Sequence, residues 1–118
     1  MTAPAYCTGI GKALLSACKP QIVDNLLKQK LEPFTPQTIT DPQILREELG
    51  KIRQQGYSVD DREHSNTVKC VAVPVFDHSG NLYGAISTSA PAYRLTDESV
   101  LNYVELLKYT AKQIQMHL

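Results

Sequence analysis

Four polar side chains that could bind or attack a small molecule lie between residues 60 and 89. Ser87 and Ser89 are two residues apart in a run with strand composition, so their hydroxyls point to the same face of a strand. Cys70 lies in an apolar run further upstream, and its thiol could line the same cavity. Either Asp60 or Asp61 supplies a carboxylate, because alternation lets only one of the two face inward. Together they could hold a small polar acid.

The strands that must position these side chains are predicted from composition and turn signals. The runs 67–76 and 82–90 are rich in β-branched and small residues, and they are separated by the turn sequence Asp77-His78-Ser79-Gly80. A short run, 57–61, precedes them. The first long run is apolar without alternation, so both faces of the sheet are expected to be covered. The polar loop 63–66 is expected to lie on the surface.

A helix is predicted to begin after Thr8, which is a good N-cap. Its first residues are Gly9, Ile10 and Gly11, followed by Lys12. Free backbone N–H groups at a helix start favour an anion, and glycines let a ligand come close, so this segment is a candidate carboxylate or phosphate site. The alternative is that the glycines only allow tight helix packing.

Three further helices are predicted from apolar residues spaced three and four apart, beginning near residues 20, 41 and 96. Their apolar stripes are, in order, Ile22, Val23, Leu26 and Leu27; Leu45, Leu49 and Ile52; and Val100, Val104, Leu107, Ala111, Ile114 and Leu118. The charged residues of the middle helix, including Glu48 and Arg53, are expected to form a solvated face.

Composition limits the classes of protein to which the chain can belong. At 118 residues with 42% hydrophobic content, residues 1–118 are expected to form one domain. Lys plus Arg equals Asp plus Glu at 12 each, which argues against a nucleic-acid surface. Three cysteines without a CxxC pair or secretory signal indicate reduced thiols in a cytoplasmic protein. No metal, cofactor or membrane segment is expected.

A cysteine-dependent enzyme is the competing interpretation. It would use Cys70 as nucleophile, His64 as its base and Asp60 or Asp61 as the orienting carboxylate. However, no local feature lowers the pKa of a thiol inside an apolar strand, and a buried cysteine commonly behaves as a small hydrophobe. We therefore expect no catalysis.

Three segments together resemble the C-terminal effector-binding domain of IclR-type bacterial transcription regulators. They are Pro4 with TGIGKALLS (8–16), TITDPQILREELGKIRQQGYSVDDREH (38–64) and VKCVAVPVFDHSGNLYGAISTSAPAYRLT (68–96). Each motif is weak alone, but the set is specific, and the likeness runs from about Pro4 to the C-terminus.

The resemblance implies an α+β, GAF-like fold, in which an antiparallel sheet is flanked by helices and the family's first strands are absent. It also implies a small organic-acid or sugar-acid effector that alters repression or activation at promoters. The effector's carboxylate would meet the backbone at Gly9 and Ile10. The side chains implied to complete the pocket are Asp60, Cys70, Ser87 and Ser89, with Val68 and Ala3 in its apolar wall.

Two departures from the family pattern matter. The helix-turn-helix domain has no counterpart before Met1, so the chain is expected to be a fragment or a shortened relative, and DNA binding would belong to a domain outside it. The usual glycine before Pro91 is Ala90. A homo-oligomer, dimer or tetramer, is expected, and an oligomerisation module that recruits another copy through the last helix or the missing sheet edge is a further alternative.

Overall fold

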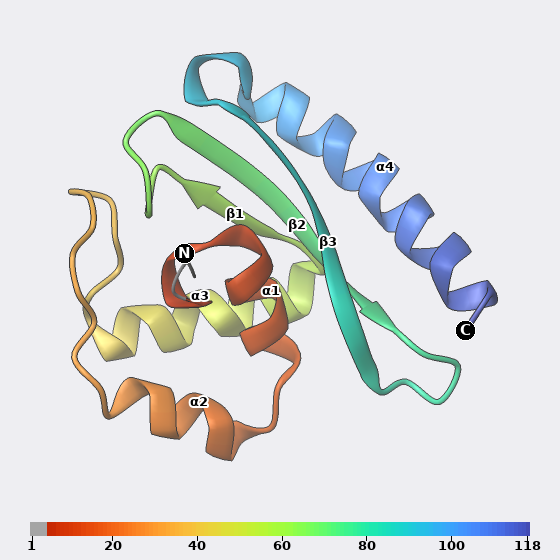
Figure 1. Ribbon diagram of the computed structural model, residues 1–118, viewed down its shortest axis with the longest axis horizontal. Helices are drawn as coiled ribbons and strands as arrows, with labels where there is room; N and C mark the ends of the chain where they lie inside the picture. Colours follow the sequence, from red (N-terminus) through yellow and green to blue (C-terminus); the bar gives the residue numbers. More distant parts are fainter. Residues whose placement is uncertain (1–4) are drawn as a thin grey trace.

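A computed structural model describes residues 5–118, which form a three-stranded antiparallel sheet between two helical layers (Figure 1). The elements in chain order are η1 (Ala5–Cys7), α1 (Gly9–Ala17), α2 (Pro20–Leu27), α3 (Pro42–Gln55), β1 (Ser58–Asp61), β2 (Val68–Phe76), β3 (Leu82–Pro91), η2 (Ala92–Arg94) and α4 (Asp97–Met116). The expected α+β class, with an antiparallel sheet flanked by helices, is confirmed.

The central strand is β2, which pairs with β1 on one side and β3 on the other. The turn between β2 and β3 forms as its sequence predicts: Asp77 Oδ1 accepts hydrogen bonds from the N–H groups of Ser79 and Asn81, both at 2.9 Å. Gly80 has φ 83°, a conformation that favours glycine. A bulge between Val75 and Phe76 shifts the register near this turn.

Helix α1 packs directly on one face of the sheet, which we call the α1 face, and α2 and α3 lie beyond it on the same side (Figure 1). The predicted stripe of α3, Leu45, Leu49 and Ile52, is buried there. This helix begins and ends where its sequence indicates. The Asp41 side chain accepts hydrogen bonds from the backbone N–H groups of Gln43 and Ile44, and Gly56 ends the helix in the left-handed backbone conformation. By contrast, α2 buries no residue completely and Ile22 is 51% exposed, so its stripe covers the rim of the core.

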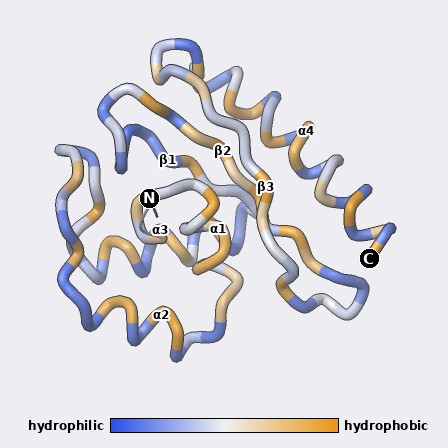
Figure 2. Tube along the Cα trace, viewed as in Figure 1, coloured by the Kyte–Doolittle hydropathy of each residue, from blue (hydrophilic) through white to orange (hydrophobic). Residues whose placement is uncertain are grey.

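Helix α4 covers the opposite face of the sheet, as the ribbon shows (Figure 1). Val100, Val104 and Leu107 are buried against Val71 and Val73 of β2. The apolar centre of β2 is visible between the two helical layers (Figure 2). The predicted α4 stripe is correct in its first half and fades toward the C-terminus, where Ala111 and Ile114 are half-buried and Leu118 is 40% exposed.

Both faces of the sheet are therefore covered, as the unbroken apolar run of β2 predicts. No helix within residues 5–118 combines the length and the apolar character needed to cross a membrane.

Candidate functional site

The strand register places three of the predicted side chains in one row across the sheet. Asp60 of β1 is opposite Cys70 of β2, and Cys70 is opposite Ser89 of β3. Ser58, Ala72 and Ser87 form the neighbouring row. Because directly opposed residues share a face, both rows lie on the α1 face.

The first turn of α1 lies directly over this row. A Cβ added to Gly9 would be 2.9 Å from Cys70 Sγ, and one added to Gly11 would be 2.3 Å from the Ala5 carbonyl oxygen. Tight packing therefore accounts for both glycines. Thr8 caps the helix by accepting a hydrogen bond from Gly11 N at 3.1 Å. Within residues 5–118, the N–H groups of Gly9 and Ile10 have no hydrogen-bond acceptor, so they remain available to an anion.

The side chains of the site become more exposed from β1 toward β3. Asp60 and Cys70 are buried, Ser87 is half-buried, and Ser89 and Val68 are exposed. Ile10 is 39% exposed. A shallow depression of about 390 Å³ lies over Thr67, Val68, Ser89, Ala90 and Pro91. Within residues 5–118, the row is therefore buried at its β1 end and exposed at its Ser89 end. Ala3 lies outside the described residues.

Two hydrogen bonds attach β1 to the rest of the site. Ser58 Oγ donates to the Gly9 carbonyl oxygen at 2.6 Å, which holds α1 against the sheet. Asp60 Oδ1 accepts from the backbone N–H of Glu63 at 2.7 Å. Burial raises the pKa of the Asp60 carboxyl above its ordinary value, although this hydrogen bond and Lys12 partly oppose the shift.

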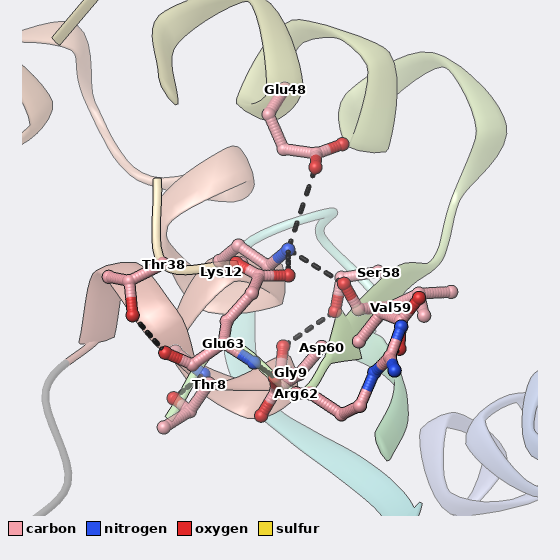
Figure 3. A network of polar contacts seen from close by, with 12 residues as sticks. Thr8, Gly9, Lys12, Thr38, Glu48, Ser58, Val59, Asp60, Arg62 and Glu63 are labelled. Atoms are coloured by element: carbon pink, nitrogen blue, oxygen red, sulfur yellow. Dashed lines mark hydrogen bonds and ion pairs between the residues drawn. The ribbon is translucent and has the colours of Figure 1, made fainter. Parts of the chain in front are cut away.

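Lys12 is the centre of a buried polar network beneath the site (Figure 3). Its side chain is 0% exposed, and Nζ lies 2.7 Å from both the Val59 carbonyl oxygen and Glu63 Oε2. Glu48 Oε2 of α3 lies 3.6 Å away. The amine therefore joins α1, α3, β1 and the loop after β1.

The expectation that the loop 63–66 lies on the surface is wrong for its first residue. Glu63 is 5% exposed, its carbonyl oxygen accepts a hydrogen bond from Thr38 Oγ1, and its Oε1 has no partner within residues 5–118. Burial raises the pKa of the Glu63 carboxyl, while Lys12 opposes that shift. The expected solvated face of α3 is also interrupted, because Glu48 turns toward Lys12 and Arg53 donates to the Ser16 carbonyl oxygen.

Sequence reasoning missed Lys12 and Glu63, although one signal was present. Lys12 is the only charged residue of α1, GIGKALLSA, and no acid lies within one turn of it. A charge in an apolar helix without a local partner indicates a partner elsewhere in the fold.

The register places Asp60 opposite Cys70, but within residues 5–118 no hydrogen bond joins the Cys70 thiol to the proposed base, His64. The Cys70 thiol lies 3.9 Å from the Val71 carbonyl oxygen, and the His64 ring packs on Phe34 with centroids 5.1 Å apart. Asp60 Oδ1 accepts a hydrogen bond from the backbone N–H of Glu63, and the Asp61 carboxylate forms an ion pair with Arg62 at 2.9 Å. Among residues 5–118, no group of His, Cys, Asp and Glu has the arrangement of a metal site.

Comparison with known proteins agrees with this geometry. The family model described as bacterial transcriptional regulator IclR C-terminal matches residues 1–116. The chain belongs to the IclR family. It is 40% identical over 112 residues to the HTH-type transcriptional repressor AllR of Klebsiella pneumoniae, an alignment that covers 94% of this chain and 41% of that protein. Its relatives are transcriptional regulators, and the domain is a regulatory effector domain, not an enzyme.

Two solved IclR-family structures show the same fold. The crystal structure of Thermotoga maritima IclR superimposes with a TM-score of 0.93 at 39% identity, covering 100% of this chain and 48% of that one. The inducer binding domain of the PobR transcription factor from Acinetobacter, a double mutant in complex with 3-hydroxy benzoic acid, has a TM-score of 0.87 at 32% identity. That match covers 95% of this chain and 67% of the PobR chain. The chain thus spans less than half the length of the AllR and T. maritima IclR chains.

Proposed function

We propose that this domain binds a small organic acid or sugar acid beside the start of α1, over the exposed Ser89 end of the row. The observation that carries the proposal is the position of Gly9 over the row Asp60, Cys70 and Ser89. The N–H groups of Gly9 and Ile10 would hold the carboxylate, because a helix N-terminus carries a partial positive charge.

The polar side chains of the two rows can form hydrogen bonds with the part of such a ligand that lies away from its carboxylate. Ser87 and Ser89 can donate to or accept from hydroxyl and oxo groups, and Asp60 can accept a hydrogen bond from a hydroxyl. Val68 and Ile10 supply apolar surface at the open side. The complex of the related PobR domain with 3-hydroxy benzoic acid, a carboxylic acid, supports this ligand class.

We further propose that ligand binding changes DNA binding by a helix-turn-helix domain outside residues 1–118. The chain covers only 41% of its AllR relative, which is described as an HTH-type repressor, so repression is the proposed action of the complete regulator. The effector would act by binding one conformation or assembly more tightly than another.

Calorimetric titration with 2-oxo acids, sugar acids and hydroxybenzoates tests the proposal. Ser89→Ala should weaken the binding of a carboxylate ligand about two- to tenfold, since a hydrogen bond to an uncharged hydroxyl or oxo group contributes about 0.5–1.5 kcal/mol. Thr88→Ala is the matched control, because Thr88 is adjacent but faces α4 through its pairing with Val71. Saturable binding that neither change alters would place the ligand elsewhere.

A further inference from the structure

Three carboxyl groups lie around the buried amine of Lys12 (Figure 3). Lys12, Asp60 and Glu63 are buried. Glu48 approaches the amine from α3, and its side chain is partly exposed. If all three carboxyl groups were ionised, they would place three negative charges against one positive charge. Unbalanced charge in a buried site is unfavourable, so one of these carboxyl groups is expected to hold a proton.

Asp60 is the carboxyl group of this cluster that has no ion pair within residues 5–118. Lys12 Nζ lies 2.7 Å from Glu63 Oε2 and 3.6 Å from Glu48 Oε2, whereas the hydrogen bond to Asp60 comes from the backbone N–H of Glu63. Glu63 Oε1 is buried and has no hydrogen-bond partner among the described residues. A proton on Asp60 would remove one buried charge and supply an O–H donor in the neighbourhood of that acceptor.

The other titratable groups around Asp60 do not change this balance. Outside the cluster, the groups that face or adjoin it are the thiols of Cys7 on η1 and Cys70 on β2, the carboxyl group of Asp61 and the ring of His64. Burial, with a smaller contribution from nearby carboxylates, raises the pKa of Cys7 to about 11, so this thiol stays neutral. His64 favours ionised Asp60 less than Lys12 does. The strongest positive charge acting on Asp60 among the described residues is therefore one that two other carboxylates already share.

A bound carboxylate would add a further negative charge beside the same row. Gly9 lies over Cys70, and Cys70 is opposite Asp60 in the strand register. Since neighbouring strands are about 5 Å apart, a carboxylate held by the N–H groups of Gly9 and Ile10 would lie within roughly 10 Å of Asp60. At that distance two charges in a partly buried site still repel, which favours the neutral form of Asp60.

We infer that Asp60 is a proton-binding group, and that an anionic effector binds together with a proton that Asp60 takes up from solvent. The effector keeps its carboxylate at the start of α1, and the new proton on Asp60 offsets the charge that the effector brings. Because the bound state then holds more protons than the free state, affinity rises as the pH falls, by at most about tenfold per pH unit. The coupling rests on the proposed ligand site, whereas the proton held by Asp60 in the free domain does not.

Calorimetric titration with pyruvate, gluconate and 3-hydroxybenzoate tests the coupling. Titrations at pH 5.5, 6.5 and 7.5, each in two buffers of different ionisation enthalpy, give the number of protons taken up per ligand bound. Wild type should take up about 0.3–1 proton in at least one of these conditions and bind more tightly at the lower pH. Asp60→Asn should abolish this uptake. Asp61→Asn, the same chemical change at the adjacent position, should leave it unaltered.

His64→Gln separates Asp60 from the other group that could take up a proton near the site. Uptake that persists in Asp60→Asn and disappears in His64→Gln would overturn the inference. Binding without any proton uptake would overturn the coupling while the ligand site stands.

Carbon-13 NMR titration of the side-chain carboxyl groups tests the free domain without any ligand. Asp60 should stay protonated to a higher pH than Asp61. Glu63→Gln should lower the midpoint of Asp60, because the Lys12 ammonium then has one competing carboxylate fewer. An Asp60 midpoint at or below that of Asp61 would overturn the proton site. If none of the three acids binds and the Asp60 midpoint is raised, the proposed function and the coupling fail while the proton site stands.

Discussion

Replacing Lys12 by methionine should destabilise the domain more than any surface charge change. Methionine is close in volume to lysine but leaves the Glu63 carboxylate buried, with its 2.7 Å partner removed. Removing one member of a buried ion pair typically costs about 3–5 kcal/mol. Glu48, which is 3.6 Å from Nζ and 29% exposed, would lose a weaker interaction.

The stability lost in Lys12→Met should be a large fraction of the domain's total free energy of unfolding. A domain of this size is stable by about 5–15 kcal/mol. With an unfolding entropy of about 2.1 cal/mol/K per residue over 118 residues, a loss of about 3–5 kcal/mol lowers Tm by about 12–20 °C. Thermal and urea unfolding followed by circular dichroism measure both quantities.

Two further variants test whether the lost stability comes from the broken Lys12–Glu63 ion pair and not from altered side-chain packing. Lys12→Met/Glu63→Leu should recover most of the loss, because an apolar pair of similar size removes the unpaired buried charge. Lys30→Met is the surface control: Lys30 lies 3.8 Å from Glu32 with side chains 83% and 60% exposed, so its effect should stay below about 0.5 kcal/mol.

The effect should also depend on pH. Lys12 lowers the pKa of Glu63, so in Lys12→Met that pKa rises further above its ordinary value and the folded variant takes up a proton as the pH falls. The deficit should therefore be smaller at pH 5 than at pH 8. A Lys12→Met protein within about 1 kcal/mol of wild type, or a double variant no more stable than the single one, would refute this account of the network.

Three other measurements test separate contacts. Gly9→Ala should cost about 1–3 kcal/mol, because its Cβ would meet Cys70 Sγ at 2.9 Å, and adding Cys70→Ala should relieve part of that loss in urea unfolding; no relief would contradict the contact. Burial raises the pKa of the Asp60 carboxyl, so the stability that this carboxyl contributes is present at low pH and is lost as the pH rises above about 4. Asp60→Asn should therefore gain stability relative to wild type between about pH 4 and pH 7, and a relative loss would contradict the sign. Burial raises the pKa of the Cys7 thiol to about 11, so a thiol reagent at pH 8 should modify half-buried Cys18 well before Cys7, and equal rates would contradict it.

Local rules predicted much of the fold. Caps such as Asp41 and Thr96, the Asp77 turn and Gly56 act within a few residues of chain, so their sequence signals are sufficient. Alternation along a strand is equally local, and it correctly put Ser87 and Ser89 on one face and allowed one inward aspartate, Asp60. The roles of these residues in ligand binding remain a prediction.

The sequence by itself therefore determined the elements, their faces, and the set of side chains that could meet. The tertiary structure alone decided that Glu63 is buried and paired with Lys12, a lysine 51 residues away. The physical reason is that periodicity and capping follow from backbone geometry over one or two turns, whereas the burial of a charge depends on which distant elements pack together.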